Sequence, residues 1–577
     1  AYLRGSGQMN RAAPVERVVY WIGVAALIWI VITFLILPLV ASLHAAFFKD
    51  GSLVVGQIAS ELSRSRRVRA ALWNTLWMTS ATMVTVTIVG MFQVVVLEYF
   101  HVRGRALLKI AYATPLVFGG VVAAAGYNFT YGPSGAVTHL VKAAVSSLPQ
   151  AWFIGWFGVL FTHTFLMTNF YYLFLRAAMR RVDYATIEAA RSMGASEYTI
   201  LWRVVLPAIM PTFLAVTLLT LYTAISSFAA PQVLGGRDFH MLSQMVLTLN
   251  SLRRPDMAAL LALMMGLCLM ALILLSQYFE ARGSYVGGAK ATAPIQLRKI
   301  CSPIGNAVLH LFAYLLVAIY TVPIALVVLF SFAPAASIGI EVIPSSLTLK
   351  NYTRVFTEGS AFLPFFNSIV MSLVAVSAAL VVTLFAVPVI LGRRSWLTRL
   401  LDITFFLPWV VPSILLAVGL IVTFDSPNPL VGNAVLLGGY WLLPIGYAIV
   451  ALPLMVRFLR AAFVGIDPAY NEAARSMGAT GLYRYRRIIL PIVAPTVILV
   501  AGMAFNDLLS EYPLSAFLYN VNNKPLPIAI VDSSLSVDPE QAALNLVYVN
   551  LIMVFSMAII LLAERIGLGK GPETTTL

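Results

Sequence analysis

Long apolar runs recur along the chain, and most are long enough to cross a lipid bilayer. Because a helix rises about 1.5 Å per residue, about 20 apolar residues span the hydrocarbon core. Short polar stretches and Gly- and Pro-rich stretches separate the runs. The pattern predicts an all-α polytopic membrane protein of about 12 transmembrane helices, at residues 18–43, 71–97, 107–127, 152–179, 207–230, 256–279, 306–332, 365–391, 400–423, 441–462, 491–515 and 543–563.

Two polar segments interrupt the apolar pattern, and they are copies of one another. The first begins at Glu188 and reads EAARSMGASEYTILWRVVLP; the second begins at Glu472 and reads EAARSMGATGLYRYRRIILP. Gly194 and Gly478 keep the same offset of 284 residues. Charged segments of this size cannot lie in hydrocarbon, because their charges and backbone groups would be left unsatisfied. Both copies are therefore expected on the same aqueous side.

The similarity extends beyond the polar segments, so the chain is predicted to contain two copies of one membrane unit. The string FLRAA occurs at 174–178 and again at 458–462, with the same offset. We predict two parallel six-helix repeats, related by an axis along the membrane normal. Their predicted bounds are 1–279 and 306–577, with a cytoplasmic linker at 280–305 and the polar motifs at 184–207 and 468–491.

Composition excludes a water-soluble globular protein. Hydrophobic residues make up 60% of the 577 residues, charged residues only 11%, and the mean hydropathy is +0.89. The net charge of +15 does not indicate nucleic acid, because Lys and Arg gather in the short cytoplasmic loops of membrane proteins. On this basis both termini are expected in the cytoplasm. The first apolar run is too long for a signal-peptide core and is interpreted as a retained helix.

No constellation for catalysis or metal binding is visible. The string around Gly567 and Lys570 lacks the spacing and the Ser or Thr of a Walker A loop. Cys268 and Cys301 are isolated, so neither a disulfide framework nor a cysteine metal site is indicated. We expect a transport subunit that is not itself an enzyme and holds no cofactor or metal. If ATP drives transport, the ATPase must be a separate chain.

The repeated motif resembles that of permease subunits of bacterial type I ABC importers, in the binding-protein-dependent transport family. That motif is Glu-Ala-Ala, three residues, Gly, nine residues, then a hydrophobic residue, any residue and Leu-Pro. Both copies fit, with Val204 and Ile488 in the hydrophobic position. The resemblance implies a multi-pass permease of the bacterial inner membrane that forms the translocation path. It also implies two copies of a cytoplasmic ABC ATPase, which binds ATP and Mg, and an external or periplasmic substrate-binding protein.

In that family the first short helix of the motif lies across a groove in the ATPase. The residues themselves predict this helix, with Asp183 and Asp467 as N-caps and Gly194 and Gly478 as its ends. A second short helix should end at the Leu-Pro that opens the next membrane helix. By position, the resemblance assigns ATPase coupling to Glu188, Ala189, Ala190, Gly194, Glu472, Ala473, Ala474 and Gly478. The small alanines suit close approach of a partner backbone.

Asp507 and Glu511 are candidates for the translocation path. They are four residues apart in the predicted helix 491–515, hence on one face, and Asn506 is adjacent. An acid at membrane depth is a functional candidate by default, although it can also pack against a polar neighbour. The matching first-half positions are Thr223 and Ser227. The two halves are therefore expected to differ here.

Polar residues in two other places allow a structural or a functional interpretation. His163 and Asn169 are expected to form interhelical hydrogen bonds. An external stretch, SRSRRVRA, runs against the usual depletion of basic residues outside the membrane. It is either a solvated amphipathic cap before the second helix or a contact for an acidic binding protein or for anions. Its arginines are Arg64, Arg66, Arg67 and Arg69.

The fused halves and the string SSFAAPQVLGG at 226–236 most resemble permeases of the iron(III) type. Their relatives for phosphonates, thiamine, sulfate and polyamines stay open, because specificity in such importers comes largely from the binding protein. An alternative of another class is a secondary transporter driven by an ion gradient, with Asp402, Asp507 and Glu511 as coupling acids. Such a carrier would not need the two cytoplasmic motifs.

Overall fold

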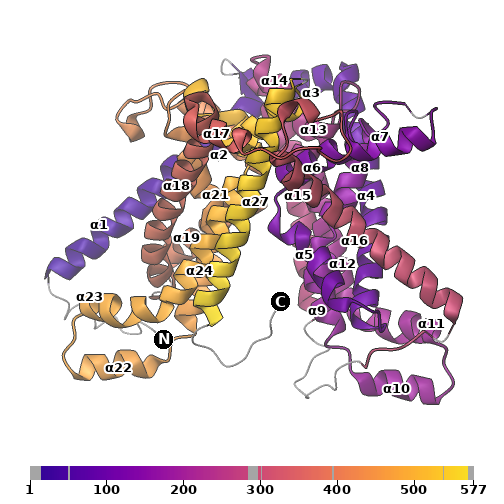
Figure 1. The fold of residues 1–577 in the computed structure, drawn as a ribbon. Helices are drawn as coiled ribbons and strands as arrows, with labels where there is room; N and C mark the ends of the chain where they lie inside the picture. The colour runs from indigo at the N-terminus through magenta and orange to yellow at the C-terminus, as the bar shows by residue number, and fades with distance from the viewer. Residues whose placement is uncertain are drawn as a thin grey trace.

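The computed structural model describes residues 14–49, 52–147, 149–283, 296–300, 302–392, 395–536 and 538–568. The described chain is helical apart from short connections and an antiparallel hairpin of two-residue strands, β1 Phe48–Lys49 and β2 Ser52–Leu53. Figure 1 shows two legs that meet at one end and diverge toward the other. The predicted all-α membrane fold is confirmed.

The first half of the chain contains fifteen α-helices and three π-helical turns in the described residues. The α-helices are α1 Pro14–Val31, α2 Leu37–Phe47, α3 Val55–Arg64, α4 Arg66–Glu98, α5 Arg105–Val117, α6 Gly120–Tyr131, α7 Ala136–Ala144, α8 Trp156–Leu166, α9 Arg176–Met179, α10 Tyr184–Ser192, α11 Glu197–Ile200, α12 Leu206–Ser226, α13 Ala229–Leu234, α14 Leu242–Ser251 and α15 Pro255–Gly283. The π-helical turns are η1 Ile32–Ile36, η2 Tyr171–Leu175 and η3 Leu201–Val205.

The second half repeats this order of elements, so that α4–α15 correspond in sequence to α18–α27. Its α-helices are α16 Pro303–Ser331, α17 Lys350–Thr357, α18 Gly359–Gly392, α19 Trp396–Val410, α20 Ser413–Phe424, α21 Leu442–Val464, α22 Pro468–Ser476, α23 Gly481–Arg484, α24 Leu490–Leu509, α25 Pro513–Leu518, α26 Leu526–Ser534 and α27 Pro539–Leu568. The shorter helices are η5 Ala335–Ser337, η6 Pro429–Val431, η7 Tyr485–Ile489 and η8 Val521–Asn523. The predicted division at 280–305 stays a prediction, since residues 284–295 and 301 lie outside the described residues.

Three predicted spans are interrupted. Within the described residues, nine helices are long and apolar enough to cross a membrane, or up to eleven if each bent pair is one span. The predicted helix 107–127 bends by 113° between α5 and α6, and 400–423 bends by 109° between α19 and α20. The second break falls at Val411, whose extended backbone is the conformation favoured before a proline such as Pro412. The predicted helix 152–179 is interrupted after α8, at Met167 and Thr168.

The prediction that membrane helices begin at Pro207 and Pro491 is wrong. The short helix α11 continues through η3 into α12, and α23 continues through η7 into α24. Each π-helical turn closes on the residue before the proline: the Leu206 N–H donates to Leu201 O, and the Leu490 N–H donates to Tyr485 O. A proline lacks an N–H and its ring crowds the preceding turn, and a π-helical turn accommodates both.

The first helices of each half cross to the other half. The α2 helix packs on α20, α1 contacts α18 and α19, and α16 packs on α5 and α6, as Figure 1 shows. Pro38 of α2 lies so close to α20 that a Cβ on Gly419 would come within 2.3 Å of the Pro38 carbonyl oxygen. Each leg therefore contains helices from both halves of the chain.

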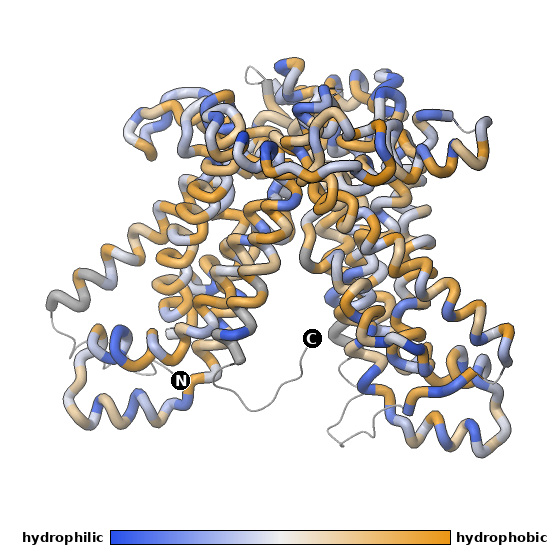
Figure 2. The backbone as a smooth tube through the Cα atoms, in the orientation of Figure 1, coloured by the Kyte–Doolittle hydropathy of each residue, from blue (hydrophilic) through white to orange (hydrophobic). Residues whose placement is uncertain are grey.

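Polar residues separate to the two ends of the molecule. Figure 2 shows mainly hydrophobic backbone along the middle of both legs and hydrophilic segments at the ends. The helices α10 and α22 lie at the tips of the two legs, whereas α3, α14 and α17 lie at the joined end (Figure 1). The two repeated motifs share one end, as expected from the sequence. That this end is cytoplasmic stays a prediction.

Candidate functional site

The two repeated motifs form the same pair of short helices. The Asp183 carboxylate accepts from the Ala185 N–H at 3.0 Å and begins α10, and the Asp467 carboxylate accepts from the Ala469 N–H at 2.9 Å and begins α22. A carboxylate at a helix N-terminus satisfies free N–H groups and suits the helix dipole. The predicted caps are confirmed.

The predicted turn after each helix is also confirmed. Gly194 and Gly478 have φ of +82° and +79°, which an L side chain rarely adopts. An added Cβ at either glycine would meet nothing within 4 Å, so the constraint lies in the backbone conformation. A second helix then starts at a hydroxyl cap, Ser196 in the first copy and Thr480 in the second.

The alanine pair of each motif faces in two directions. Ala190 and Ala474 are 8% and 2% exposed, buried against their own chain, whereas Ala189 and Ala473 are exposed. Ala189 and Ala473 are open to a partner, and the coupling role of the four alanines stays a prediction. Successive helix residues point about 100° apart, so one alanine of each pair must turn inward when the helix lies on the leg.

Two methionines at the tips of the legs were missed by the sequence interpretation. Met193 and Met477 are each 81% exposed and end the two short helices. A flexible, polarisable thioether adapts to irregular partner surfaces. Their repetition within EAARSMGA was the available signal.

The acids of the first motif are bound within the chain. The Glu188 carboxylate accepts from the Tyr184 hydroxyl and from Arg191. Arg191 also contacts Glu197, with Arg191 Nε to Glu197 Oε1 at 3.2 Å. The Tyr184 hydroxyl, followed by Arg191, holds the pKa of Glu188 below its ordinary value. We call Tyr99, Tyr184, Glu188, Arg191, Glu197 and Arg298 the first-motif network.

The same network reaches the end of α4 and the linker between the halves. The Tyr99 hydroxyl donates to Glu197, and Arg298 Nη2 lies 3.4 Å from Glu197 Oε1. The linker backbone pairs with the α4 end: the Arg298 N–H donates to Tyr99 O at 2.9 Å, and the His101 N–H donates to Arg298 O at 2.6 Å. The helix pair α10 and α11 is thus connected to the segment that joins the two halves.

The second motif lacks this network. At the 284-residue offset Pro468 replaces Tyr184 and Gly481 replaces Glu197. Glu472 is exposed, and its side chain makes no hydrogen bond or ion pair with any described residue. The geometry therefore leaves Glu472, but not Glu188, with its full hydrogen-bonding capacity.

The candidate path residues do not share one helix face. The α24 helix ends at Leu509, and Glu511 lies in the connection to α25, where its Oε1 accepts from the Leu514 N–H at 3.1 Å. Helix 491–515 was predicted too long. The Asp507 side chain is exposed. The neighbouring Asn506 Oδ1 is buried and has no hydrogen-bond partner among the described residues.

The end of α24 meets the other half. Ser510, the residue after the helix, packs on the break between α5 and α6, where a Cβ on Gly119 would come within 2.6 Å of the Ser510 Cβ. Asp507 stands three residues before Ser510.

The equivalent place in the first half is neutral and internally bonded. His163 is buried, its Nε2 lies 2.8 Å from Ser227 Oγ, and its Nδ1 lies 3.3 Å from Thr82 Oγ1. The predicted interhelical bonds of His163 are confirmed. Asn169 Oδ1 is buried and has no partner among the described residues, so the same prediction fails for that oxygen.

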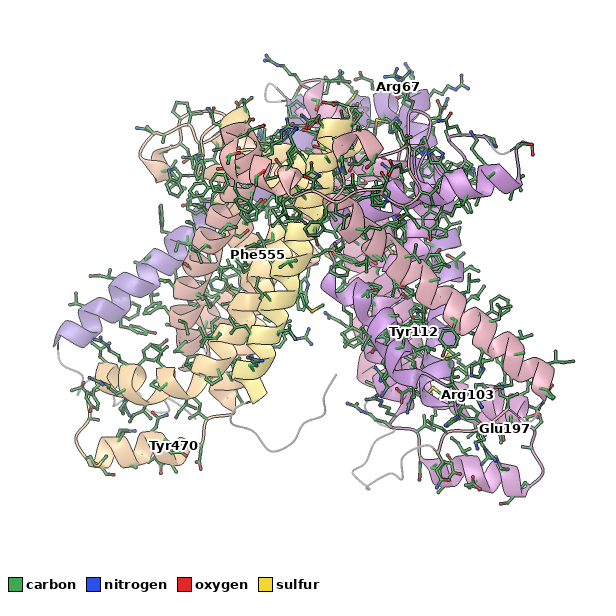
Figure 3. The ribbon with its side chains drawn as sticks, viewed as in Figure 1. Arg67, Arg103, Tyr112, Glu197, Tyr470 and Phe555 are labelled. Atoms are coloured by element: carbon green, nitrogen blue, oxygen red, sulfur yellow. The ribbon has the colours of Figure 1, made fainter. Side chains whose placement is uncertain are left out.

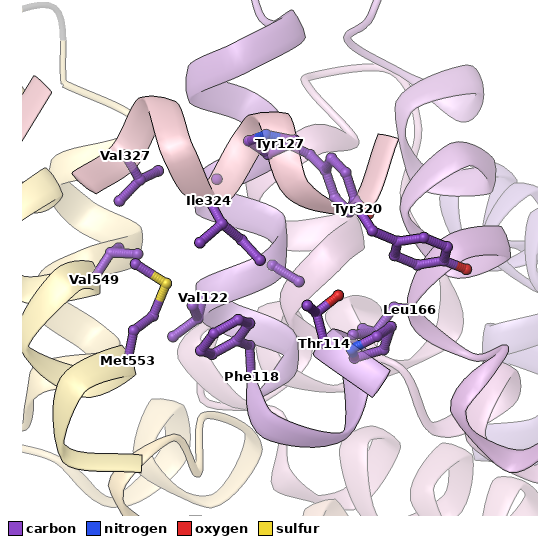
Figure 4. Close-up of a pocket in the computed structure, with 14 residues that line it drawn as sticks. Thr114, Phe118, Val122, Tyr127, Leu166, Tyr320, Ile324, Val327, Val549 and Met553 are labelled. Carbon is purple, nitrogen blue, oxygen red and sulfur yellow. The ribbon is translucent and has the colours of Figure 1, made fainter. Parts of the chain in front are cut away.

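Figure 4 shows a pocket beside the same break, on the side of α16 and α27. Its lining is apolar and includes Phe118, Ile324, Val327, Val549 and Met553. The residues that line it offer no charged side chain to a metal ion or an ionic group. Apolar contact between the two halves is the role its chemistry supports.

The remaining residues considered for coupling, metal binding or nucleotide binding are paired within the chain, isolated, or outside the described residues. Asp402 is paired with Arg460 Nη1 at 2.8 Å. No cluster of three or more His, Cys, Asp or Glu able to hold a metal occurs among the described residues. Cys268 is a free thiol there, while Cys301 and Lys570 lie outside the described residues.

Known relatives agree with this geometry. The chain is 71% identical over 99% of its length to all of the probable ABC transporter permease protein y4fN of Sinorhizobium fredii. It is 23% identical over 82% of its length to 85% of the Fe(3+)-transport system permease protein FbpB 2 of Haemophilus influenzae. It is also 23% identical over 46% of its length to 98% of the putative 2-aminoethylphosphonate transport system permease protein PhnV of Salmonella paratyphi A.

The family model named "Binding-protein-dependent transport system inner membrane component" matches residues 52–282 and again residues 384–566. Each match contains one of the two capped helix pairs. The chain is an ABC transporter permease and belongs to the family of binding-protein-dependent transport system inner membrane components.

Proposed function

We propose that this chain is the membrane component of an ATP-driven importer and binds two copies of a separate ABC ATPase. The observation that carries the proposal is the pair of equivalent helices α10 and α22 at the tips of the two legs (Figure 1). Each offers an acid, an exposed alanine and a methionine to a partner, and one helix per leg suits one ATPase per leg. ATP and Mg would be bound by that partner.

On this proposal the leg tips face the cytoplasm, and the joined end receives substrate from an external binding protein. The helix α1 begins on the side of the leg tips, and α27 ends on that side (Figure 1). This supports cytoplasmic termini.

The proposed substrate is ferric iron. Asp507 stands three residues before Ser510, which packs on the other half, and a carboxylate there attracts a cationic or metal-bearing substrate. The similarity to a permease named for Fe(3+) transport supports the same choice. Relatives named for phosphonate and for spermidine and putrescine keep those substrates as alternatives, together with thiamine and sulfate.

The test is uptake by proteoliposomes that contain the chain, its cognate ATPase and the cognate binding protein. ATP on the ATPase side should drive uptake of radiolabelled ferric iron, and excess unlabelled phosphonate or spermidine should not compete. ATP-driven uptake of another substrate would contradict the choice of ferric iron and leave the importer proposal standing. Assembly without any ATPase would contradict the importer proposal.

A secondary transporter is the alternative function, and two observations weigh against it. Asp402, one of its candidate coupling acids, is already paired with Arg460. The duplicated helix pair would have no partner in such a carrier. Uptake abolished by collapsing ion gradients, but unaffected by removing ATP, would favour it.

A further inference from the structure

The outer end of the first half carries exposed arginines that have no partner among the described residues. Their side chains form no hydrogen bond or ion pair with any described residue. These residues, the outer arginine surface, are Arg64, Arg66, Arg67, Arg69, Arg237 and Arg253. Figure 3 places Arg67 at the end opposite Glu197 and Tyr470, and thus opposite the coupling helices.

The position of this surface is unfavourable for the fold itself. Arg66, Arg67 and Arg69 occupy the first turn of α4, where the positive end of the helix dipole repels cations. Basic residues are also usually depleted outside the membrane. The buried side chains of Leu62 and Val68 fix the segment against the chain, so the arginines are held outward. Packing does not account for them.

The outer end of the second half has the opposite character. There Arg354 is bound between Glu358, at 2.8 Å, and Glu540, and Lys524 lies 2.7 Å from Asp532. Three basic residues stand there, Lys350, Arg354 and Lys524, against a larger set of acids. Those acids are Glu341, Glu358, Asp425, Asp532, Asp538 and Glu540. The outer face is therefore basic over one half and acidic over the other.

We infer that the outer arginine surface binds an acidic face of the importer's substrate-binding protein, and that the opposite charges of the two halves set its orientation. The inference rests on the proposed function. The arginines come from three separate segments, and all are exposed, whereas a small anion is held by convergent groups in a concave site. A broad exposed charged surface suits a protein face, for which complementary charge speeds association and excludes the wrong orientation.

The test measures association of the purified binding protein with the permease–ATPase complex in nanodiscs of zwitterionic lipid. The variant carries Arg66→Glu, Arg67→Glu and Arg69→Glu. The association rate should fall at least tenfold at 50 mM salt, and the difference should shrink at 300 mM, where charges are screened over a few ångströms. Basal ATP hydrolysis should stay unchanged, because the arginines lie far from the coupling helices.

Lys350→Glu is the control, since it reverses one positive charge on the same outer face but over the second half, against three reversals in the variant. It should leave association within twofold of the wild type. Wild-type association of the triple variant, or equal losses in the triple variant and Lys350→Glu, would overturn the inference. So would a loss seen only in nanodiscs that contain anionic lipid, which would assign the arginines to headgroups. If the wild-type permease binds no ATPase at all, the proposed function itself is contradicted.

Discussion

The two repeated motifs have the same backbone and different charge partners. Both run from an aspartate cap through a short helix to a left-handed glycine and a second capped helix. In the first, Glu188 and Arg191 belong to a network that reaches Tyr99 and Arg298. In the second, Glu472 has no partner among the described residues. Shape is shared between the copies, whereas charge pairing is not.

The difference indicates which interactions the duplicated unit requires. The caps and glycines fix the helix at the leg tip, and both copies keep them. The network at Glu197 holds the first helix to the linker, and the second copy has Gly481 there. The acid Glu472 is therefore free to be bound by a partner, whereas Glu188 must share its bonds.

The largest effect is expected when both acids are removed. Glu188→Ala with Glu472→Ala should abolish transport and weaken ATPase binding by one to two orders of magnitude per site, from lost charge-assisted bonds of about 1.5–3 kcal/mol each. Co-purification and uptake measure it. Normal insertion should persist. If the double variant keeps its ATPase and transports normally, these acids are not the anchor.

The second effect concerns the other difference between the halves, at the end of α24. Asp507→Asn with Glu511→Gln keeps size while removing charge, so uptake should fall several-fold or ATP hydrolysis should lose its dependence on loaded binding protein. The control is Thr223→Val, which changes a polar group at the matching first-half position and should matter less. Wild-type uptake in the double amide variant would show that the charges of Asp507 and Glu511 have no role in transport.

A smaller effect should separate the single variants. Glu472→Ala should reduce ATPase affinity about tenfold. Glu188→Ala should reduce it less, because part of the bonding of Glu188 is already made within the chain and is not gained on binding. Titration of ATPase onto each detergent-purified variant gives the comparison. Equal losses would show that the network opens when the ATPase binds.

The smallest effect is local. Glu197→Gln should loosen the first-motif network and raise hydrogen exchange of α10 two- to fivefold, since an exposed ion pair contributes about 0.5–1 kcal/mol. Gly481→Glu places an acid in the second copy at the position that matches Glu197 and should lower exchange of α22. Exchange of α10 that stays unchanged in Glu197→Gln would show that the network does not hold the helix.

The sequence predicted what depends on local physics. The caps Asp183 and Asp467 and the left-handed Gly194 and Gly478 follow from residue types at fixed spacing, and they were right. Continuity of α11 with α12 was missed, because a π-helical turn absorbs the proline at 207. Whether a helix continues through a proline depends on the turn that precedes it, which composition does not reveal.

What depends on neighbours far along the chain could not be predicted. The break after α5 lies against Ser510 of the other half, and the bond between Glu197 and Arg298 joins segments about 100 residues apart. Glu511 was placed on the same face as Asp507, because helical spacing was extended past Leu509, where the helix ends. Periodicity within one segment carries no information on such contacts.

The central claim, that α10 and α22 bind the ATPase, is tested most directly by cross-linking at the leg tips. With Cys268 and Cys301 replaced by serine, Met193→Cys and Met477→Cys place one thiol at each 81% exposed position. Each should form a cross-link to a separate ATPase copy in membranes, and membrane-impermeant thiol reagents added from outside should label neither. An assembled complex without a cross-link at either position, or labelling of either cysteine from outside, would contradict the account.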